Sequence, residues 1–488
     1  MRPFLLAAAV LVALAAAFAL GRWSHDLPSS APEDSGTGPE TSAGAPAGAA
    51  PGPSSGELPS GELPDATAGA AVSRSQVTTG EQPLRGKWRR ARSEPGETEG
   101  GAAAGAEPSA EAAAELTAVP YLQGYRPAAG ATGVTVNAPP AEPGLNLVLS
   151  AHGAEALLMT LDGTVVHRWR AALRRVWPDL PDNANLRKLD YWRRARPQPD
   201  GSLLAIFEIH GLVKLDRDSQ LLWAYRSDVH HDLFVAPDES IWVLDRRGKV
   251  DPRLHRTEPV LEDLITVLEP EGSVRRQISI LDAFLRSPFA PMVWNRPVAA
   301  GDIFHTNTLQ RLDGSLEHLH PAFREGNLLI SVLQLSTVAI LDPRTEEIVW
   351  TLSGLFRKQH QPILLPGPSD LSGPRGSSGA SLLVFDNRGP GGERSRVLEI
   401  DAITQEVLWS YGGTDDSFFS RTLGTCQRLP GGNTLIVESE NGRALEVTPD
   451  GTIVWEYRNP HRAGTNDEFV AALMDVVRLP VGFGGWGE

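Results

Sequence analysis

The sequence LEVTPDGTIVW, residues 445–455, holds two short apolar runs on either side of a Pro-Asp-Gly turn and ends on a tryptophan. Apolar residues that flank an Asp-Gly dipeptide are typical of a β-hairpin. The pattern recurs in LMTLDGTVVHRW (158–169), VKLDRDSQLLW (213–223), VAILDPRTEEIVW (338–350) and LEIDAITQEVLW (398–409). A degenerate copy, TVLEPEGSVRR (266–276), ends on an arginine instead.

A second unit follows each hairpin and consists of a short polar strand, a turn rich in Pro, Asp and Gly, and an apolar strand. Its copies are RRARPQPDGSLLAIF (193–207), HHDLFVAPDESIWVL (230–244), HTNTLQRLDGSL (305–316), QHQPILLPGPS (359–369) with SLLVFDN (381–387), and TCQRLPGGNTLIVE (425–438). Together the two units make a four-stranded blade that repeats about every 45–75 residues, as in β-propellers. Six hairpin copies predict an all-β, six-bladed β-propeller. A β-sandwich or several small β domains is the alternative, which the single repeat disfavours.

The two ends of the repeat region predict how the ring closes. The first hairpin lacks a preceding polar strand, and the segment ALMDVVRLP (472–480) has the character of the missing one. We therefore expect residues 474–479 to pair with NLVLS (146–150), so that N- and C-terminal strands close one blade. Such pairing removes an open sheet edge.

The N-terminal part of the chain has a different composition. An apolar run over residues 3–21 is about long enough to span a bilayer as a helix, and residues 17–19 also fit a signal-peptidase site. Residues 1–25 are therefore expected to be an uncleaved membrane anchor or a cleaved signal peptide. Either one predicts a protein outside the cytoplasm, periplasmic or extracellular, and secreted if the segment is removed.

The segment 26–117 is dominated by Gly, Ala, Pro, Ser and Glu. Such a composition offers too little bulky apolar surface to fold, and it predicts a disordered linker. The propeller is then expected over residues 118–488.

Charge and cysteine content exclude several classes of protein. The net charge of −15 argues against a general affinity for nucleic acid or anionic lipid. The single cysteine, Cys426, allows no disulfide within the chain. The sequence also lacks the paired Cys or Cys/His spacings of a zinc site, and we expect no cofactor.

Histidines gather on the polar strands, which line the central channel of a propeller. They occur in His230-His231-Asp232, in His305-Thr306-Asn307 and in Gln359-His360, out of twelve histidines in the chain. Residues two apart share one face of a strand, so His305 and Asn307 are expected to point the same way. Spacing leaves open whether His230 or His231 faces the axis. Converging imidazoles suit metal ligation, acid–base catalysis or nucleophilic catalysis.

Over residues 145–458 the hairpin tryptophans, the HHD and HxN motifs, and the QH followed by FDN resemble the bacterial PAPS-independent arylsulfate sulfotransferase family. The resemblance implies an exported six-bladed propeller that moves a sulfuryl group from an aryl sulfate to a phenol. The group would pass through a transient sulfohistidine in a ping-pong reaction. The implied partners are small molecules, the aryl sulfate and the phenol.

The resemblance also implies roles for single residues. His360 matches the nucleophile of the family. His305 and Asn307 match the pair that binds the sulfate and assists proton transfer, and His230 or His231 matches the first channel histidine.

The sequence departs from the family pattern at two places. An arginine that grips the sulfate is expected after an Ile-Ser pair, where this chain has Leu333. Leucine cannot replace a bidentate guanidinium, so Arg388 or Arg421 is expected to supply the charge from another blade. Gln361 stands where a small or acidic residue is usual.

Two other functions compete with the transferase. Leu333 favours a propeller that has lost the chemistry and binds ligands or serves as a scaffold at the cell surface, whereas a polar histidine channel favours the enzyme. A quinone- or metal-dependent dehydrogenase is disfavoured because the sequence has no cysteine pair, haem motif or stacking-tryptophan pattern. The insertion at residues 280–301 is expected to form a lid or a homodimer contact.

Overall fold

The computed structural model describes part of the chain: residues 124–127, 130–367, 377–414, 418–464 and 466–486. The predicted N-terminal segment 1–25 and the predicted linker 26–117 lie outside the described residues. The described residues all belong to one compact unit, the second of two, which covers residues 99–488. Every helix within the described ranges falls short of the length and apolarity needed to span a membrane.

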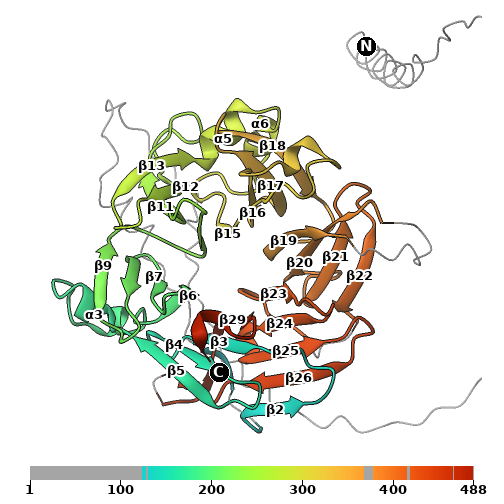
Figure 1. The fold of residues 1–488 in the computed structure, drawn as a ribbon. Coiled ribbons are helices and arrows are strands. Elements are labelled where there is room, and N and C mark those ends of the chain that lie inside the picture. The colour runs from blue at the N-terminus through green and yellow to red at the C-terminus, as the bar shows by residue number, and fades with distance from the viewer. Residues whose placement is uncertain (1–123, 128–129, 368–376, 415–417, 465, 487–488) are drawn as a thin grey trace, which may run out of the picture. The chain divides into compact units, whose positions relative to one another are not determined.

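The second unit is an all-β propeller, with sheets arranged around a common centre (Figure 1). The strands of three sheets are given first, each sheet starting from the strand nearest the centre. Their strands are β29 (Leu473–Leu479), β3 (Leu145–Ser150), β4 (Glu155–Met159) and β5 (Val165–Arg170); β6 (Trp192–Pro197), β7 (Leu203–Phe207), β8 (Gly211–Leu215) and β9 (Leu221–Tyr225); and β10 (Leu233–Val235), β11 (Ile241–Lys249), β12 (Val260–Leu268) and β13 (Val274–Ser279), with β14 (Gly301–Asp302) beside β12.

Three more sheets of four or five strands complete the ring among the described residues. Their strands are β15 (Thr306–Arg311), β16 (Leu328–Val332), β17 (Thr337–Asp342) and β18 (Glu347–Ser353); β19 (His360–Pro366), β20 (Ala380–Asp386), β21 (Arg396–Asp401) and β22 (Val407–Gly412); and β23 (Thr425–Arg428), β24 (Thr434–Glu438), β25 (Arg443–Val447) and β26 (Ile453–Arg458), with β2 (Gly133–Asn137) beside β26. The middle strands are apolar and buried, which gives each sheet a face to pack on the next.

The tryptophan of the hairpin motif joins neighbouring sheets. Its indole N–H donates to a turn carbonyl of the next sheet in the pairs Trp169–Gly201 (3.1 Å), Trp223–Pro270 (3.1 Å), Trp409–Pro449 (2.7 Å) and Trp455–Leu161 (2.8 Å). In the degenerate copy, Arg276 donates through Nη1 to the carbonyl of Pro343 at 3.1 Å. The exchanged side chain therefore keeps the inter-sheet hydrogen bond that the tryptophan makes elsewhere.

Strands from both ends of the described chain close the ring. β29 pairs with β3 from Leu473↔Ser150 to Leu479↔Leu145, which confirms the predicted pairing. The structure adds a contact that the sequence did not reveal, because β2 pairs with β26 and extends that sheet by a strand. Two adjacent sheets thus each contain a strand from the opposite end of the repeat region.

The described residues also form a small sheet and several short helices besides the six larger sheets. β1 (Gly124–Pro127), β28 (Phe469–Ala471) and β27 (Arg462–Ala463) form a three-stranded sheet. The short helices are α3 (Leu173–Val176) and α4 (Ala184–Arg187), together with the single turns η1 (Pro321–Phe323), η2 (Ser439–Asn441) and η3 (Phe483–Gly485).

The insertion at residues 280–301 folds as α5 (Ile280–Arg286) and α6 (Ala290–Trp294). Ser279 caps α5 by accepting the backbone N–H of Asp282 at 3.1 Å. Phe284 is fully buried in the core shared with β12 and β16, and α5 lies against β12, β13 and β18. The insertion is therefore packed on two neighbouring sheets, while Trp294 leaves 52% of its surface exposed.

Candidate active site

Four of the six inner strands share a local irregularity. The pairing of β6, β15, β19 and β29 with the next strand shifts register directly after Trp192, Thr306, His360 and Leu473, whereas β10 and β23 pair without a shift. Such bulges bend a strand and redirect a side chain. His231 (φ 55°) and His305 (φ 52°), just before β10 and β15, adopt left-handed backbone conformations, a costly geometry that is often found at functional sites.

Three of the four predicted histidines have rings in contact with another histidine ring. The rings of His231 and His305 lie 4.8 Å apart between centroids, and those of His230 and His231 lie 5.1 Å apart. His360 interacts electrostatically with His231 and His305. His230 and His231 are each 1% exposed and His360 is 4% exposed, whereas 11% of the His305 side chain is accessible. Solvent therefore reaches the cluster mainly at His305.

The tautomer of His360 follows from its neighbours. Asn387 donates both amide N–H groups, to the carbonyls of Ser420 (2.9 Å) and Leu423 (2.7 Å), so its Oδ1 must be the atom that faces His360. That oxygen lies 2.8 Å from Nδ1 of His360 and can only accept. Nδ1 of His360 therefore carries the proton in the neutral ring, and Nε2 carries the lone pair.

The pKa of His360 is lowered to about 3, chiefly by burial. The hydrogen bond to Asn387 opposes the shift, and the positive charge of Arg193 adds to it. The imidazole is thus neutral at neutral pH. A neutral ring with a defined lone pair is the form in which histidine acts as a nucleophile.

The same reasoning separates His230 from His231. Nε2 of His230 lies 3.3 Å from the carbonyl of Asp245, so it carries the proton, and its Nδ1 accepts the Nδ1–H of His231 at 2.9 Å. The ring of His231 then faces His305, with Nδ1 also 3.7 Å from Glu208. Burial lowers the pKa of both histidines well below the usual value. His231 is therefore the one that belongs to the cluster around His360, and His230 orients it.

His305 is held by acidic groups. Its Nδ1 contacts the carboxylate of Asp302. Burial would raise the pKa of Asp302, but the interaction with His305 outweighs it and lowers the pKa to about 2. Nearby Asp263 accepts the backbone N–H of Thr306 at 2.6 Å, and burial together with the charge of Asp302 raises the pKa of Asp263 to about 6. The Asp302 carboxylate thus orients the ring of His305 through Nδ1.

Asn307 and Arg388 have partners of their own. Asn307 donates through Nδ2 to the carbonyl of Gln359 at 2.8 Å, so it braces the start of the strand that carries His360. Arg388 donates to the carbonyl of Gly392 at 2.9 Å, and its guanidinium lies 6.0 Å from the Phe419 ring. Among the described contacts, those of Arg388 do not include one of the four histidines.

Arg421, the other arginine expected to replace the missing one, and Leu333 are the remaining predicted site positions. Arg421 is exposed. Leu333 directly follows β16, and its backbone N–H points to the carbonyl of His305 at 3.4 Å. The site where the family carries an arginine therefore adjoins the histidine cluster, and neither predicted replacement is seen to contact that cluster within the described structure.

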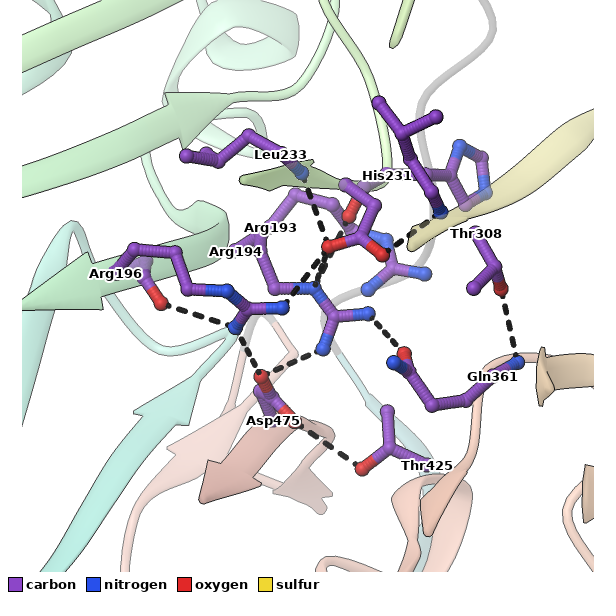
Figure 2. Close-up of polar contacts among 12 residues, drawn as sticks. Arg193, Arg194, Arg196, His231, Leu233, Thr308, Gln361, Thr425 and Asp475 are labelled. Atoms are coloured by element: carbon purple, nitrogen blue, oxygen red, sulfur yellow. Dashed lines mark hydrogen bonds and ion pairs between the residues drawn. The ribbon is translucent and has the colours of Figure 1, made fainter. Parts of the chain in front are cut away.

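Beneath the histidines, Arg194 ties the inner strands together (Figure 2). Its guanidinium donates to the carbonyl of His231 (3.2 Å), to Oδ2 of Asp475 (2.6 Å) and to Oε1 of Gln361 (2.7 Å). The backbone N–H of Gln361 in turn donates to the hydroxyl oxygen of Thr308 at 3.1 Å. Gln361, the second departure from the family pattern, thus serves as a ligand of this buried arginine.

Arg193 is a site residue that the sequence analysis missed. Trp192 occupies the register that Thr306 and His360 occupy in their strands, so Arg193 lies at the level of Asn307 and Gln361. It is 2% exposed, and Nε lies 3.5 Å from Glu208. The signal was present in RRARP, which aligns with the histidine-bearing polar strands.

One further group of metal-ligand type lies among the described residues. The ligand atoms of His152, Glu155 and His461 lie within 4.8 Å of one another. However, the rings of His152 and His461 are stacked at 3.5 Å with planes only 2° apart. Since the lone pairs of imidazole lie in the ring plane, two parallel rings do not direct them at one ion. Each residue would have to change rotamer before the group could bind a metal.

Several solved structures are similar to this chain at low sequence identity. A protein of unknown function from Bacteroides caccae shares 11% identity with a TM-score of 0.43, covering 69% of this chain and 98% of that one. The Dos1 propeller shares 9% identity with a TM-score of 0.35, covering 68% and 78%. Virginiamycin B lyase from Staphylococcus aureus shares 10% identity with a TM-score of 0.32, covering 55% and 69%. No curated protein matches the sequence.

The family comparison covers the histidine motifs. The arylsulfotransferase (ASST) family model matches residues 198–460, more than half of the 488 residues. This range includes the hairpin repeats after β6 and all four channel histidines. The chain belongs to the arylsulfotransferase (ASST) family.

Proposed function

We propose that the protein is a PAPS-independent arylsulfate sulfotransferase that moves a sulfuryl group from an aryl sulfate to a phenol through His360. The observation that carries the proposal is the hydrogen bond between His360 and Asn387. It sets the proton on Nδ1 and the lone pair on Nε2, while burial keeps the ring neutral. Membership of the arylsulfotransferase family supports an aryl sulfate as the substrate.

In the first half-reaction, Nε2 of His360 forms a bond to sulfur while the bond from sulfur to the aryl oxygen breaks. The electron pair of that bond leaves with the phenolate. The ring becomes a sulfo-imidazolium, and its Nδ1–H still donates to Asn387. We assign protonation of the phenolate to the pair His231 and His305, whose rings lie 4.8 Å apart, because a positioned imidazole is an effective general acid.

In the second half-reaction, an acceptor phenol returns a proton to the same pair as its oxygen attacks the sulfur. The bond between Nε2 and sulfur breaks, and its electron pair returns to His360. Atoms and charge balance over the two steps without a cofactor.

The test is turnover of a chromogenic aryl sulfate, with and without a phenol acceptor. The proposal predicts release of 4-nitrophenol that depends on the acceptor, with the parallel double-reciprocal lines of a ping-pong reaction. His360→Asn should abolish it. Turnover that survives this substitution would refute the assignment of the nucleophile.

A second candidate is a ligand-binding or scaffold module, and Leu333 is the observation that favours it. An aryl sulfate that binds to the wild-type protein without any turnover, over hours and across a panel of phenol acceptors, would support this alternative. Detectable acceptor-dependent turnover would exclude it.

We further propose that the six larger sheets are the complete set of blades and that the propeller works outside the cytoplasm. Residues 1–25 would anchor or export it, and residues 26–117 would serve as the linker. Limited proteolysis should then release a stable fragment that begins between residues 118 and 145, and protease added to intact cells or spheroplasts should reach the linker. A stable fragment that contains residues 26–117 would contradict the linker.

A further inference from the structure

We propose that Arg193 supplies the guanidinium that binds the sulfuryl oxygens, and so brings from β6 the charge that Leu333 does not provide beside β16. The inference rests on the proposed function and names the residue on which its anion binding depends. Neither Arg388 nor Arg421, the two replacements expected from the sequence, fills this role.

The first argument is an unsatisfied donor. Arg193 is 2% exposed, and its Nε and Nη1 atoms are buried without a hydrogen-bond partner among the described residues. Within the described part of the chain its ion-pair partner is Glu208, with an oxygen 3.5 Å from Nε. Buried donors in folded proteins are nearly always paired, so a buried guanidinium with N–H groups to spare points to a ligand.

The second argument is position. Arg193 lies in the bulge of the inner strand β6, at the level of the bulge that follows His360 in β19. Its charge contributes to the low pKa of both His231 and His360. For His231 it is the largest effect after burial, and for His360 it is the largest after burial and the Asn387 hydrogen bond. Figure 2 draws Arg193 and His231 beside the Arg194 network, to which Arg193 makes no bond. The guanidinium therefore lies near enough to His360 and His231 for its charge to lower the pKa of both.

The third argument is that neighbouring cations are already committed. Arg194 is held by three acceptors and by the carboxylate of Asp232 at 3.4 Å. Lys358 donates through Nζ to Gln334 at 2.5 Å. Because these groups have partners that an incoming anion would have to displace, Arg193 is the better anion ligand.

Glu208 is the group that opposes an anion at this place. Burial raises its pKa, although Arg193 lowers it again in part. A buried carboxyl that takes up a proton as a sulfuryl group arrives would remove the repulsion and could donate a hydrogen bond to a sulfuryl oxygen. The planar fork of the guanidinium can meanwhile hold two sulfuryl oxygens at once.

The experiment measures binding without transfer. 4-Nitrobenzenesulfonate has the charged group of an aryl sulfate, but its carbon–sulfur bond cannot be broken by the proposed reaction. Its Kd is measured by calorimetry on the full chain for the wild type, Arg193→Lys and the double variant Arg193→Met/Glu208→Gln. The double variant removes both members of the buried pair, so that no carboxylate is left uncompensated.

We expect binding to weaken about 10- to 100-fold in the double variant, the range for a lost hydrogen bond to a charged group, and by less in Arg193→Lys. Arg196→Gln is the matched control, because it removes an arginine from the same strand whose guanidinium pairs with Asp232 and Asp475. Arg196→Gln should leave the Kd within about twofold, since the guanidinium of Arg196 already has acidic partners and is not an unpaired donor. Adding Leu333→Arg to the double variant should restore part of the affinity.

The outcomes separate the inference from the proposed function. Unchanged sulfonate affinity in a folded double variant, or an equal loss in Arg196→Gln, would overturn the role of Arg193 even if the wild type turns over aryl sulfates. Binding that depends on Arg193 in a protein without turnover would uphold the anion site and reject the transferase.

Discussion

Oδ1 of Asn387 lies 2.8 Å from Nδ1 of His360, and the amide cannot turn around because both of its N–H groups are held by backbone carbonyls. The pair joins the start of β19 to the end of β20. Asn387, which follows the next strand of the same sheet, thereby fixes which nitrogen of His360 carries the proton.

Replacing Asn387 with leucine should therefore slow the reaction without removing the nucleophile. Loss of the acceptor frees His360 to adopt the other tautomer, and we expect kcat to fall by about 10²–10⁴, the span seen when a catalytic imidazole is mispositioned. Steady-state kinetics measure the change, and KM should move much less. A rise in KM with an unchanged kcat would argue for a role in substrate recognition instead.

The buried histidines predict a loss of stability in mild acid. The pKa of His360 is lowered to about 3 in the folded protein from a usual value of 6.5, and the pKa values of His230 and His231 are lowered as well. Below pH 6.5 the unfolded chain therefore binds protons that the folded protein does not. Stability should fall as the pH drops from about 6.5 towards 3, by up to ~1.4 kcal/mol per pH unit for each such group.

The measurement is the unfolding midpoint as a function of pH, in wild type and in His360→Gln. The substitution removes one titrating group, so the acid side of the profile should become shallower. Identical slopes in the two proteins would show that His360 does not stay neutral in the folded state.

Arg194 should be essential to the fold rather than to the chemistry. Its guanidinium joins β6 to β29 and β19 through Asp475 and Gln361, and removing one member of a buried ion pair typically costs about 3–5 kcal/mol. Arg194→Met should lower the free energy of unfolding by that amount in denaturant titration. The partly exposed Arg196 is the control, and its replacement by glutamine should cost less. Equal losses would mean that burial of Arg194 is irrelevant.

The signature tryptophans should stabilise contacts between blades. Trp455→Phe keeps an aromatic side chain but removes the N–H that donates to Leu161 and part of the fully buried indole ring. The unpaired carbonyl alone should cost about 1–3 kcal/mol, and the lost packing adds to it. Trp294→Phe is the control, because the side chain is 52% exposed. A null result for Trp455 in chemical denaturation would show that the hydrogen bond is replaced, for example by water.

The sequence predicts those parts of the molecule that repeat. Each Asp-Gly turn and its tryptophan fix a hairpin locally. The first hairpin, which ends at Trp169, lacks a preceding polar strand, and β29 supplies it. The pairing of β2 with β26 was missed because GVTVN has no counterpart in the repeat. A repeat pattern predicts the strands that all blades share. It cannot predict a strand, such as β2, that occurs in one blade only.

The site was predicted in part for a similar reason. Strand starts carrying histidine were recognisable, whereas the choice between His230 and His231 depends on the carbonyl of Asp245 and on a left-handed backbone. Arg193 escaped notice because two arginines follow each other in RRARP. Arg194 has hydrogen-bond partners for its guanidinium, whereas Nε and Nη1 of Arg193 have none among the described residues. This difference is visible only in the packed structure.

The most direct test of the central claim is mass spectrometry of the protein after incubation with an aryl sulfate in the absence of acceptor. The account predicts one sulfuryl group on the peptide that contains His360, which disappears when a phenol is added with formation of its sulfate ester. Wild-type protein that releases phenol without any modification of His360, or that carries the sulfuryl group on another residue, would contradict it.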